Sequence, residues 1–270
     1  MSTIQNNKGD KNPPNIQNAD FARHGKLKLK PHPGFPHARD RNLAAVNVSE
    51  LGVSCGNFPI VLARYPENKR MVLMALLGLK ASENVYCGEE YWESTYVPLA
   101  IQRHPFIVGI DERVTDTMQL ATCLEIDSAC LNETDGLPLF NADGTQSEVL
   151  RSADQLLHSM FDAGAVTERF IEKLQELNLV TPLVIVLQSP RGELNRITGL
   201  ATIDENKLKA LSAEQLKELQ SLDFLASCHL MLVSLYQLRQ LIRLRNRKGG
   251  EQITNFRLEF PGDTPADAKA

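Results

Sequence analysis

The residues best suited to holding a ligand gather between positions 92 and 106. This stretch contains the only tryptophan, Trp92, followed by Tyr96, Arg103 and Phe106. Aromatic rings supply contact area in ligand pockets, and a guanidinium group anchors anions. We therefore expect these four residues to line a site for a small ligand or a protein partner. The alternative is that the three aromatic residues pack a helix onto a sheet while Arg103 is solvated or paired.

An acidic, turn-rich segment offers a second kind of chemistry, because Ca²⁺ accepts carboxylate oxygens on such backbone. Its four acids are Asp127, Glu133, Asp135 and Asp143. Their spacing is not that of an EF-hand loop, so a solvated acidic loop is the better interpretation. The five cysteines are widely spaced and form no CxxC pair, which favours reduced, buried thiols over a disulfide framework.

Motifs for covalent or nucleotide chemistry are missing from the sequence. Ser54 and Ser189 lack a GxSxG context, and no glycine-rich phosphate loop follows a predicted strand. His158 and His229 lie in apolar helical patterns without a second His four residues away, which favours structural histidines. We predict no catalytic residue, no metal and no cofactor, and the sequence leaves open whether the protein is an enzyme.

The first 42 residues form a basic arm, with eight Lys or Arg against three Asp, a local charge of +5. Basic segments bind nucleic acids or anionic surfaces. The arm is nevertheless rich in Asn, Lys and Pro with little apolar periodicity, which predicts a disordered, solvated segment up to about Phe35. Acidity elsewhere would repel a duplex, so no nucleic-acid partner is predicted.

Targeting signals are equally sparse. The N-terminus, MSTIQNNKGDKNPPN, has no apolar core of a secretory signal. The most apolar run, Phe224–Leu235, is about half the length needed to cross a bilayer. These features predict no transmembrane segment and a cytoplasmic location, with the cell surface reached only by export without a signal peptide.

Two hairpins and a short helix are expected to position the candidate residues. Apolar, β-branched runs flank turn sequences in the pairs Pro59–Tyr65 with Arg70–Leu77 and Leu183–Leu187 with Leu194–Ile203. Further strands are expected at Leu43–Val48, Phe106–Ile110 and Gln119–Ile126. A short helix over Leu99–His104 begins after Pro98 and ends before Pro105.

Longer helices are predicted in the second half of the chain. Thr145 and Glu148 form a capping box ahead of an apolar stripe, which Gly164 is expected to break. A long C-terminal helix is predicted over about Asp223–Arg245, apolar in its first half and basic at its end.

The fold class predicted from these patterns is α+β. Antiparallel hairpins are packed by several helices, and both ends of the chain are disordered tails. Three parts are expected: a disordered basic arm at 1–40, a single domain at 41–247 and a flexible tail at 248–270.

Four segments resemble the SapC family of bacterial proteins, in the same order. They are MALLGLKASENVY, a Trp followed by YVPLAIQRHPF, GLPLFNADGTQSEVL and a terminal Leu-rich helix. Ser82 stands where relatives usually carry Gly, which suggests that the turn does not demand a positive φ or that Ser82 sits beside the demanding position. His104 replaces an aromatic residue, so it is a poor candidate for a family-wide catalytic base.

The resemblance implies an association with S-layer or outer-membrane function, and relatives are often encoded near outer-membrane receptors and flavin-dependent halogenases. It supplies no catalytic residue. Two functions stay open. The first is a non-enzymatic binding protein that presents the region from Trp92 to Phe106 to a partner or small ligand. The second is an accessory enzyme that acts on a small organic or peptide substrate beside an oxidative, halogenase-type partner.

Overall fold

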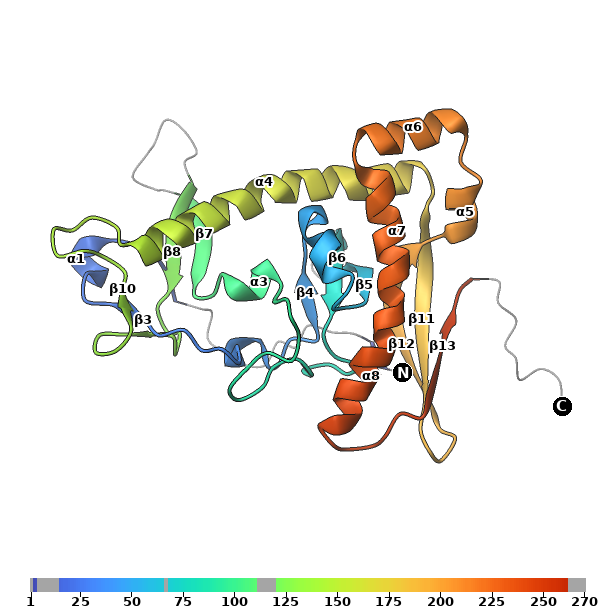
Figure 1. The fold of residues 1–270 in the computed structure, drawn as a ribbon, viewed down its shortest axis with the longest axis horizontal. Helices are drawn as coiled ribbons and strands as arrows, with labels where there is room; N and C mark the ends of the chain where they lie inside the picture. The colour runs from blue at the N-terminus through green and yellow to red at the C-terminus, as the bar shows by residue number, and fades with distance from the viewer. Residues whose placement is uncertain (1, 4–14, 66–67, 111–119, 262–270) are drawn as a thin grey trace.

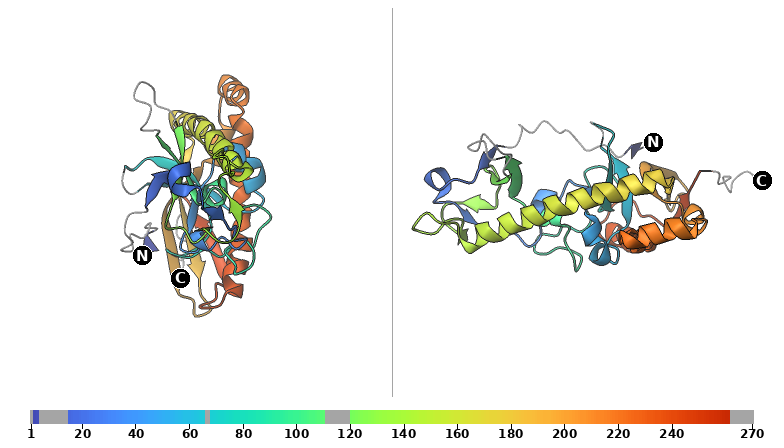
Figure 2. Two further views of the ribbon diagram at one scale, coloured as in Figure 1. Left: turned by 90° about the vertical axis from the view of Figure 1, so that its left-hand side faces the viewer. Right: turned by 90° about the horizontal axis from the view of Figure 1, so that it is seen from above.

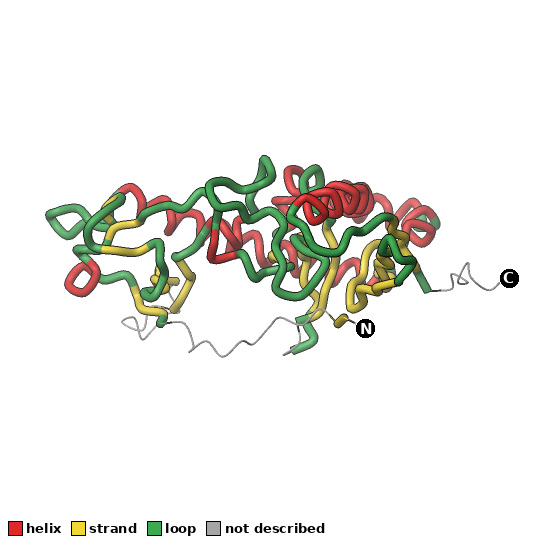
Figure 3. Tube along the Cα trace, turned by 90° about the horizontal axis from the view of Figure 1, so that it is seen from below, coloured by secondary structure: helices red, strands yellow, loops and turns green. Residues whose placement is uncertain are grey.

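The protein is an elongated α+β structure in which one long helix joins two packed groups of strands (Figure 1). The computed structural model describes residues 2–3, 15–65, 68–110 and 120–261. Strands gather toward the two ends of the molecule, with loops and short helices between them (Figure 3). The predicted fold class, antiparallel strands packed by helices, is confirmed.

A seven-stranded sheet forms the larger group, in the order β13-β11-β12-β5-β6-β4, with β1 parallel to β12. Its strands are β1 (Ser2–Thr3), β4 (Leu43–Ala45), β5 (Ile60–Arg64), β6 (Met71–Leu76), β11 (Val180–Gln188), β12 (Leu194–Ile203) and β13 (Asn255–Glu259). Both predicted hairpins are confirmed as β5–β6 and β11–β12. The pairing of β12 with β5 joins the two hairpins into one sheet.

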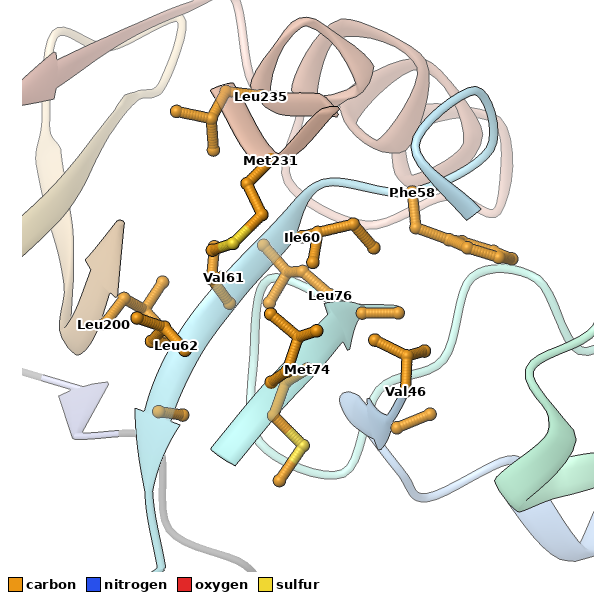
Figure 4. Packing of buried hydrophobic residues seen from close by; sticks show 14 of the residues in the cluster. Val46, Phe58, Ile60, Val61, Leu62, Met74, Leu76, Leu200, Met231 and Leu235 are labelled. Carbon is orange, nitrogen blue, oxygen red and sulfur yellow. The ribbon is translucent and has the colours of Figure 1, made fainter. Parts of the chain in front are cut away.

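Apolar runs of the hairpins are buried because helix α7 (Phe224–Ser234) lies across the sheet. Val61 points toward Met231 of this helix, and Leu62 lies beside Leu200 of β12 (Figure 4). None of Val61, Leu62 and Met231 is accessible to solvent. Burying a side chain of this size contributes about 1.5–3 kcal/mol, so this layer is the main source of stability in the larger group.

The smaller group consists of two three-stranded sheets and the short helix α1 (Phe21–His24). Its strands are β2 (Ile16–Asn18), β3 (Lys28–Leu29), β7 (Phe106–Ile110), β8 (Leu120–Glu125), β9 (Leu131–Asn132) and β10 (Leu137–Pro138). A separate apolar cluster, which includes Phe106, Leu124 and Leu139, forms the core of this smaller group.

Part of the basic arm is therefore ordered, although the sequence predicts disorder up to Phe35. Strand β2 pairs with β8, and β3 lies between β9 and β10. These residues are ordered because they pair with strands about 100 residues away in the chain, and such pairing cannot be predicted from the local composition of the arm. Residues 4–14 lie outside the described residues, and the division of the chain into arm, domain and tail stays a prediction.

Helix α4 (Glu148–Glu176) spans both groups (Figure 1). Its first half buries Leu150 and Leu157 in the smaller cluster, and its second half buries Phe170 and Leu174 in the larger core. Ser147 caps its N-terminus by accepting from the N–H of Leu150, so the predicted Thr145 cap is wrong. The predicted break at Gly164 is also wrong, because the helix continues through it.

Thr145 fails as the cap because its hydroxyl bonds instead to the Asp143 carboxylate, 2.6 Å away. The prediction of a break at Gly164 gave too much weight to the low helix propensity of glycine. Glycine costs a helix interior about 1 kcal/mol, which packing of the two flanking apolar segments exceeds.

Several other helices lie on one side of the larger sheet (Figure 2). They are α2 (Leu51–Ser54), α5 (Glu205–Lys209), α6 (Ala213–Ser221), α7, the 3₁₀ turn η3 (Leu235–Gln237) and α8 (Leu238–Arg247). The predicted C-terminal helix thus exists as α7–η3–α8. No single helix of the described residues is long and apolar enough to span a membrane. Helix α6 together with α7–α8 reaches that length and apolarity, but the two parts are bent by 92° relative to each other.

Two further expectations need correction. Residues 255–259 were expected in a flexible tail, but they form β13 and pair with β11, because Phe256 and Leu258 alternate with polar residues and reach the core.

Ser82 has a φ of 56°, so its turn does demand the left-handed region and Ser82 itself adopts it.

Candidate functional site

Trp92 is a packing residue at the edge of the larger core. Its ring stacks on Tyr86, with centroids 5.7 Å apart, and meets Phe58 and Phe35 edge-on. The indole N–H donates to the carbonyl of Tyr96 at 2.9 Å. Because only 7% of Trp92 is exposed, it offers little surface to a ligand in this conformation.

Tyr96 fixes the entry to helix α3 (Leu99–Gln102) through a buried carboxylate. Its hydroxyl donates to Oε2 of Glu50 at 2.8 Å, and the same oxygen accepts from the N–H of Leu99 at 2.9 Å. The other oxygen, Oε1, accepts from the N–H of Asn47 at 2.9 Å. Burial, and then the Glu50 carboxylate, raise the pKa of Tyr96 well above its usual range.

Phe106 belongs to the other group of strands. It is 5% exposed and packs in the smaller apolar cluster with Leu124. The structure therefore places Trp92 and Tyr96 on one core and Phe106 on another, with Arg103 in the connection between them. Two cavities in the described part of the chain, one beside α7–α8 and one beside Leu79, are not lined by any of the four predicted residues.

Arg103 stands at the junction of the two groups, next to a second arginine. Its Nη1 donates to the carbonyl of Phe106 at 2.8 Å. Burial, and then the charge of nearby Arg41, lower the pKa of Arg103. Among the described residues, no carboxylate lies within ion-pairing distance of either guanidinium; Glu125 is near enough only to favour the charge of Arg103.

A pair of stacked histidines lies beside these arginines. The rings of His37 and His104 are 3.9 Å apart and tilted by 18°. Nε2 of His37 donates to the carbonyl of Ile101 at 3.1 Å, which leaves Nδ1 as an acceptor; that atom is buried and has no hydrogen-bond partner among the described residues. Burial first, and then His104 and the arginines, lower the pKa of His37 to about 4. Burial, and then Arg41 and Arg103, lower the pKa of His104 to about 4.

His104 also joins a serine and a carboxylate. Its Nε2 lies 2.7 Å from Oγ of Ser128, and its Nδ1 lies 3.4 Å from Oε2 of Glu125. A hydroxyl, an imidazole and a carboxylate in this order are the parts of a nucleophile activated by a general base. No local sequence signal marks this arrangement, because His104 lies just after α3 whereas the other two residues lie at the end of β8 and in the turn after it.

The acidic residues considered for Ca²⁺ are not assembled into a site. Asp135 pairs with Lys30 at 2.7 Å, and Asp143 accepts from the hydroxyl of Thr145. Across the part of the chain that the structure describes, no three His, Cys, Asp or Glu side chains are grouped as metal ligands. Asp135 and Asp143 thus hold surface segments in place instead.

Comparison with known proteins assigns the family. The SapC family model matches residues 20–241, which is most of the chain. The chain belongs to the SapC family. No curated protein and no solved structure matches it. The matched residues include the whole junction between the two strand groups, so Arg103, His104, Glu125 and Ser128 all lie within the SapC region.

Proposed function

We propose that this SapC-family protein is a non-enzymatic binding protein whose site lies at the junction of the two strand groups. Of the four residues expected from the sequence, Arg103 is the one placed to meet a partner, together with Arg41. Trp92, Tyr96 and Phe106 serve this site indirectly, by holding the segment that carries Arg103 between the two cores.

The observation that carries the proposal is the pair of positive charges at Arg41 and Arg103, which has no ion-pair partner among the described residues. Two neighbouring guanidinium groups repel each other, and each lowers the pKa of the adjacent His104. A carboxylate or phosphate of a partner would relieve this repulsion and accept hydrogen bonds from both groups. Arg41 is exposed, so such an anion can approach it from solvent.

Capture from a native host extract tests the site. The immobilised protein is compared with Arg41→Gln, Arg103→Gln and the control Arg151→Gln, which changes an exposed arginine paired with Glu148 on α4. We expect a protein or small anionic ligand that the wild type and Arg151→Gln retain and the other two lose. Equal retention by all four proteins, each with an unchanged unfolding transition, contradicts the assignment.

We extend the proposal to cell-surface function, which the family resemblance implies, with the protein acting from the cytoplasm or after export without a signal peptide. Fractionation of the native host tests this part separately. A partner found among S-layer or outer-membrane proteins would support it, and a partner confined to soluble metabolism would contradict it.

The second candidate function is an accessory enzyme, and one observation favours it: the arrangement of Ser128, His104 and Glu125. In an acyl transfer, Oγ of Ser128 would attack a carbonyl carbon of a small organic or peptide substrate while Nε2 of His104 takes the hydroxyl proton. The carbonyl oxygen would take up the displaced electron pair, and the bond to the leaving group would then break as His104 returns the proton to that group. Two features weaken this function. Ser128 is only 8% exposed, and a pKa of about 4 makes His104 a weak base near neutral pH.

A fluorophosphonate probe decides between the candidates. Serine hydrolases react covalently with this probe, so labelling of the wild type that is lost in Ser128→Ala and His104→Gln would establish the enzyme. The binding function predicts no labelling of Ser128 in any of these proteins.

A further inference from the structure

A large groove lies far from the junction, between helices α7–α8 and the edge strand β13. It encloses about 1150 Å³. Its floor is the helix-facing side of the sheet, including Thr181, Ile203, Phe256 and Leu258, and its wall is a stripe along the helices, including Leu232, Val233 and Tyr236. The volume slightly exceeds the range of about 300–1,000 Å³ that is typical of small-ligand pockets, and the groove is open to solvent, so it suits a polypeptide element.

The wall of this groove is unusually apolar for a surface helix. Helix α7 carries apolar residues around its whole circumference, a pattern typical of a helix that is covered on all sides. Here Cys228 and Met231 face the core, whereas Val233 is 56% and Tyr236 is 73% exposed. The exposed stripe therefore has the composition of a buried contact.

The two ends of the groove carry opposite charges. Asp204 and Glu205, at the start of α5, line the end beside the first half of α7. Arg239 lines the other end, and Arg243 follows it one turn later on the same helix face. Neither of these arginines has an ion-pair partner among the described residues. The two acids pair with Lys207 and Lys209 of their own helix, and Asp204 also caps that helix.

We propose that the groove holds the α7–α8 helix of a second copy of this chain, packed antiparallel about a two-fold axis near Tyr236. Such a contact is isologous, so each copy must offer a surface complementary to itself. Seven residues of helix rise about 10 Å, which places Arg243 of one copy opposite His229 of the other, beside Asp204 and Glu205. The charges then meet as opposite pairs at both ends, and the two apolar stripes cover each other.

Other occupants fit less well. The nine residues after Pro261, GDTPADAKA, contain no large apolar side chain that could cover the stripe. A parallel helix of another copy would bring its arginines to Arg239 and Arg243 and repel them. A bilayer is flat on this scale and would leave the concave floor uncovered.

Sedimentation velocity across a concentration series tests the dimer on the full-length chain. The wild type and a control, Tyr91→Lys at a 60% exposed site outside the groove, should sediment as dimers. Tyr236→Lys and Val233→Glu should sediment as monomers with unchanged circular dichroism. A monomeric wild type at every concentration overturns the proposal.

A charge exchange tests the antiparallel arrangement. Arg243→Glu and Glu205→Lys should each weaken dimerisation roughly tenfold, and the double variant should recover most of the loss. A dimer that none of these substitutions affects places the interface elsewhere and overturns the proposal. If the wild type were monomeric and bound vesicles of phosphatidylcholine with phosphatidylglycerol, the groove would be a membrane contact and not a contact with a second copy. Because Arg41 and Arg103 lie outside the groove, their variants should dimerise normally, which separates this test from that of the binding function.

Discussion

The hydroxyl of Tyr96 donates a hydrogen bond of 2.8 Å to a glutamate, Glu50, that is only 4% exposed. Glu50 ends the 3₁₀ turn η2 (Val48–Glu50), and Tyr96 lies three positions before the first residue of α3. Three donors therefore converge on one buried carboxylate, from η2, from the Trp92 loop and from α3. This carboxylate sets the direction in which the chain enters the junction that carries Arg103.

Loss of this carboxylate should destabilise the protein strongly. Glu50→Ala leaves three donors without an acceptor and should lower the free energy of unfolding by about 3 kcal/mol. Tyr96→Phe removes a single donor and should cost about 1 kcal/mol. Urea unfolding measures both, with Glu89→Ala at an exposed site as the control. An effect of Glu50→Ala no larger than that of the control would show that the network contributes no net stability.

Acid should destabilise the protein through the two stacked histidines. Their pKa values are about 4 when folded, against 6.5 for a free imidazole, so the unfolded chain binds protons first as the pH falls. Stability is thus fully present above about pH 6.5 and is lost progressively toward pH 4. Since burial disfavours an imidazolium here, Arg41 and Arg103 repel it and the nearby Glu125 attracts it, we expect a loss of about 2 kcal/mol between pH 6.5 and pH 5.

Unfolding curves at a series of pH values measure this loss. The double variant His37→Gln with His104→Gln should show a much flatter dependence over the same range, whatever its stability at neutral pH. His158→Gln, at a site on α4 away from the junction, should keep the wild-type slope. An unchanged slope in the double variant would assign the acid sensitivity to other groups.

The regions that the sequence predicted well are those with strong local signals. The runs at β5–β6 and β11–β12 are apolar, β-branched and separated by turn residues, so their pairing is encoded within about 25 residues. Strands β2 and β3 are too short and polar to show such a signal, and they exist because β8, β9 and β10 lie beside them. The arrangement at the junction was not predictable for the same reason. Trp92 and Phe106 are 14 positions apart in the sequence but pack on different cores, and the contact of His104 with His37 crosses 67 positions.

Ser82, which adopts the left-handed region, gives a direct test of backbone strain at its turn. A residue with a side chain in the left-handed region costs about 1 kcal/mol, a cost that glycine escapes. Ser82→Gly and Ser82→Ala both delete the hydroxyl, so their difference isolates the backbone effect. We expect Ser82→Gly to be the more stable of the two by about 1 kcal/mol in urea unfolding. Equal stabilities would mean that the turn changes conformation when the side chain is replaced.

Gly164 lies in the bridge of α4 between the two strand groups, and a methyl group added there meets no atom within 4 Å. Gly164→Ala should therefore gain helix propensity without a clash and stabilise the protein by about 1 kcal/mol, or about 2–4 °C in the unfolding temperature. The matched control is Gly109→Ala in β7, where the new methyl would lie 2.4 Å from Sγ of Cys123 and should destabilise the protein. Differential scanning calorimetry compares the two variants. If Gly164→Ala lowered the unfolding temperature, α4 would need a flexible residue between the two groups, and the continuous rigid helix would be the wrong description of how they are joined.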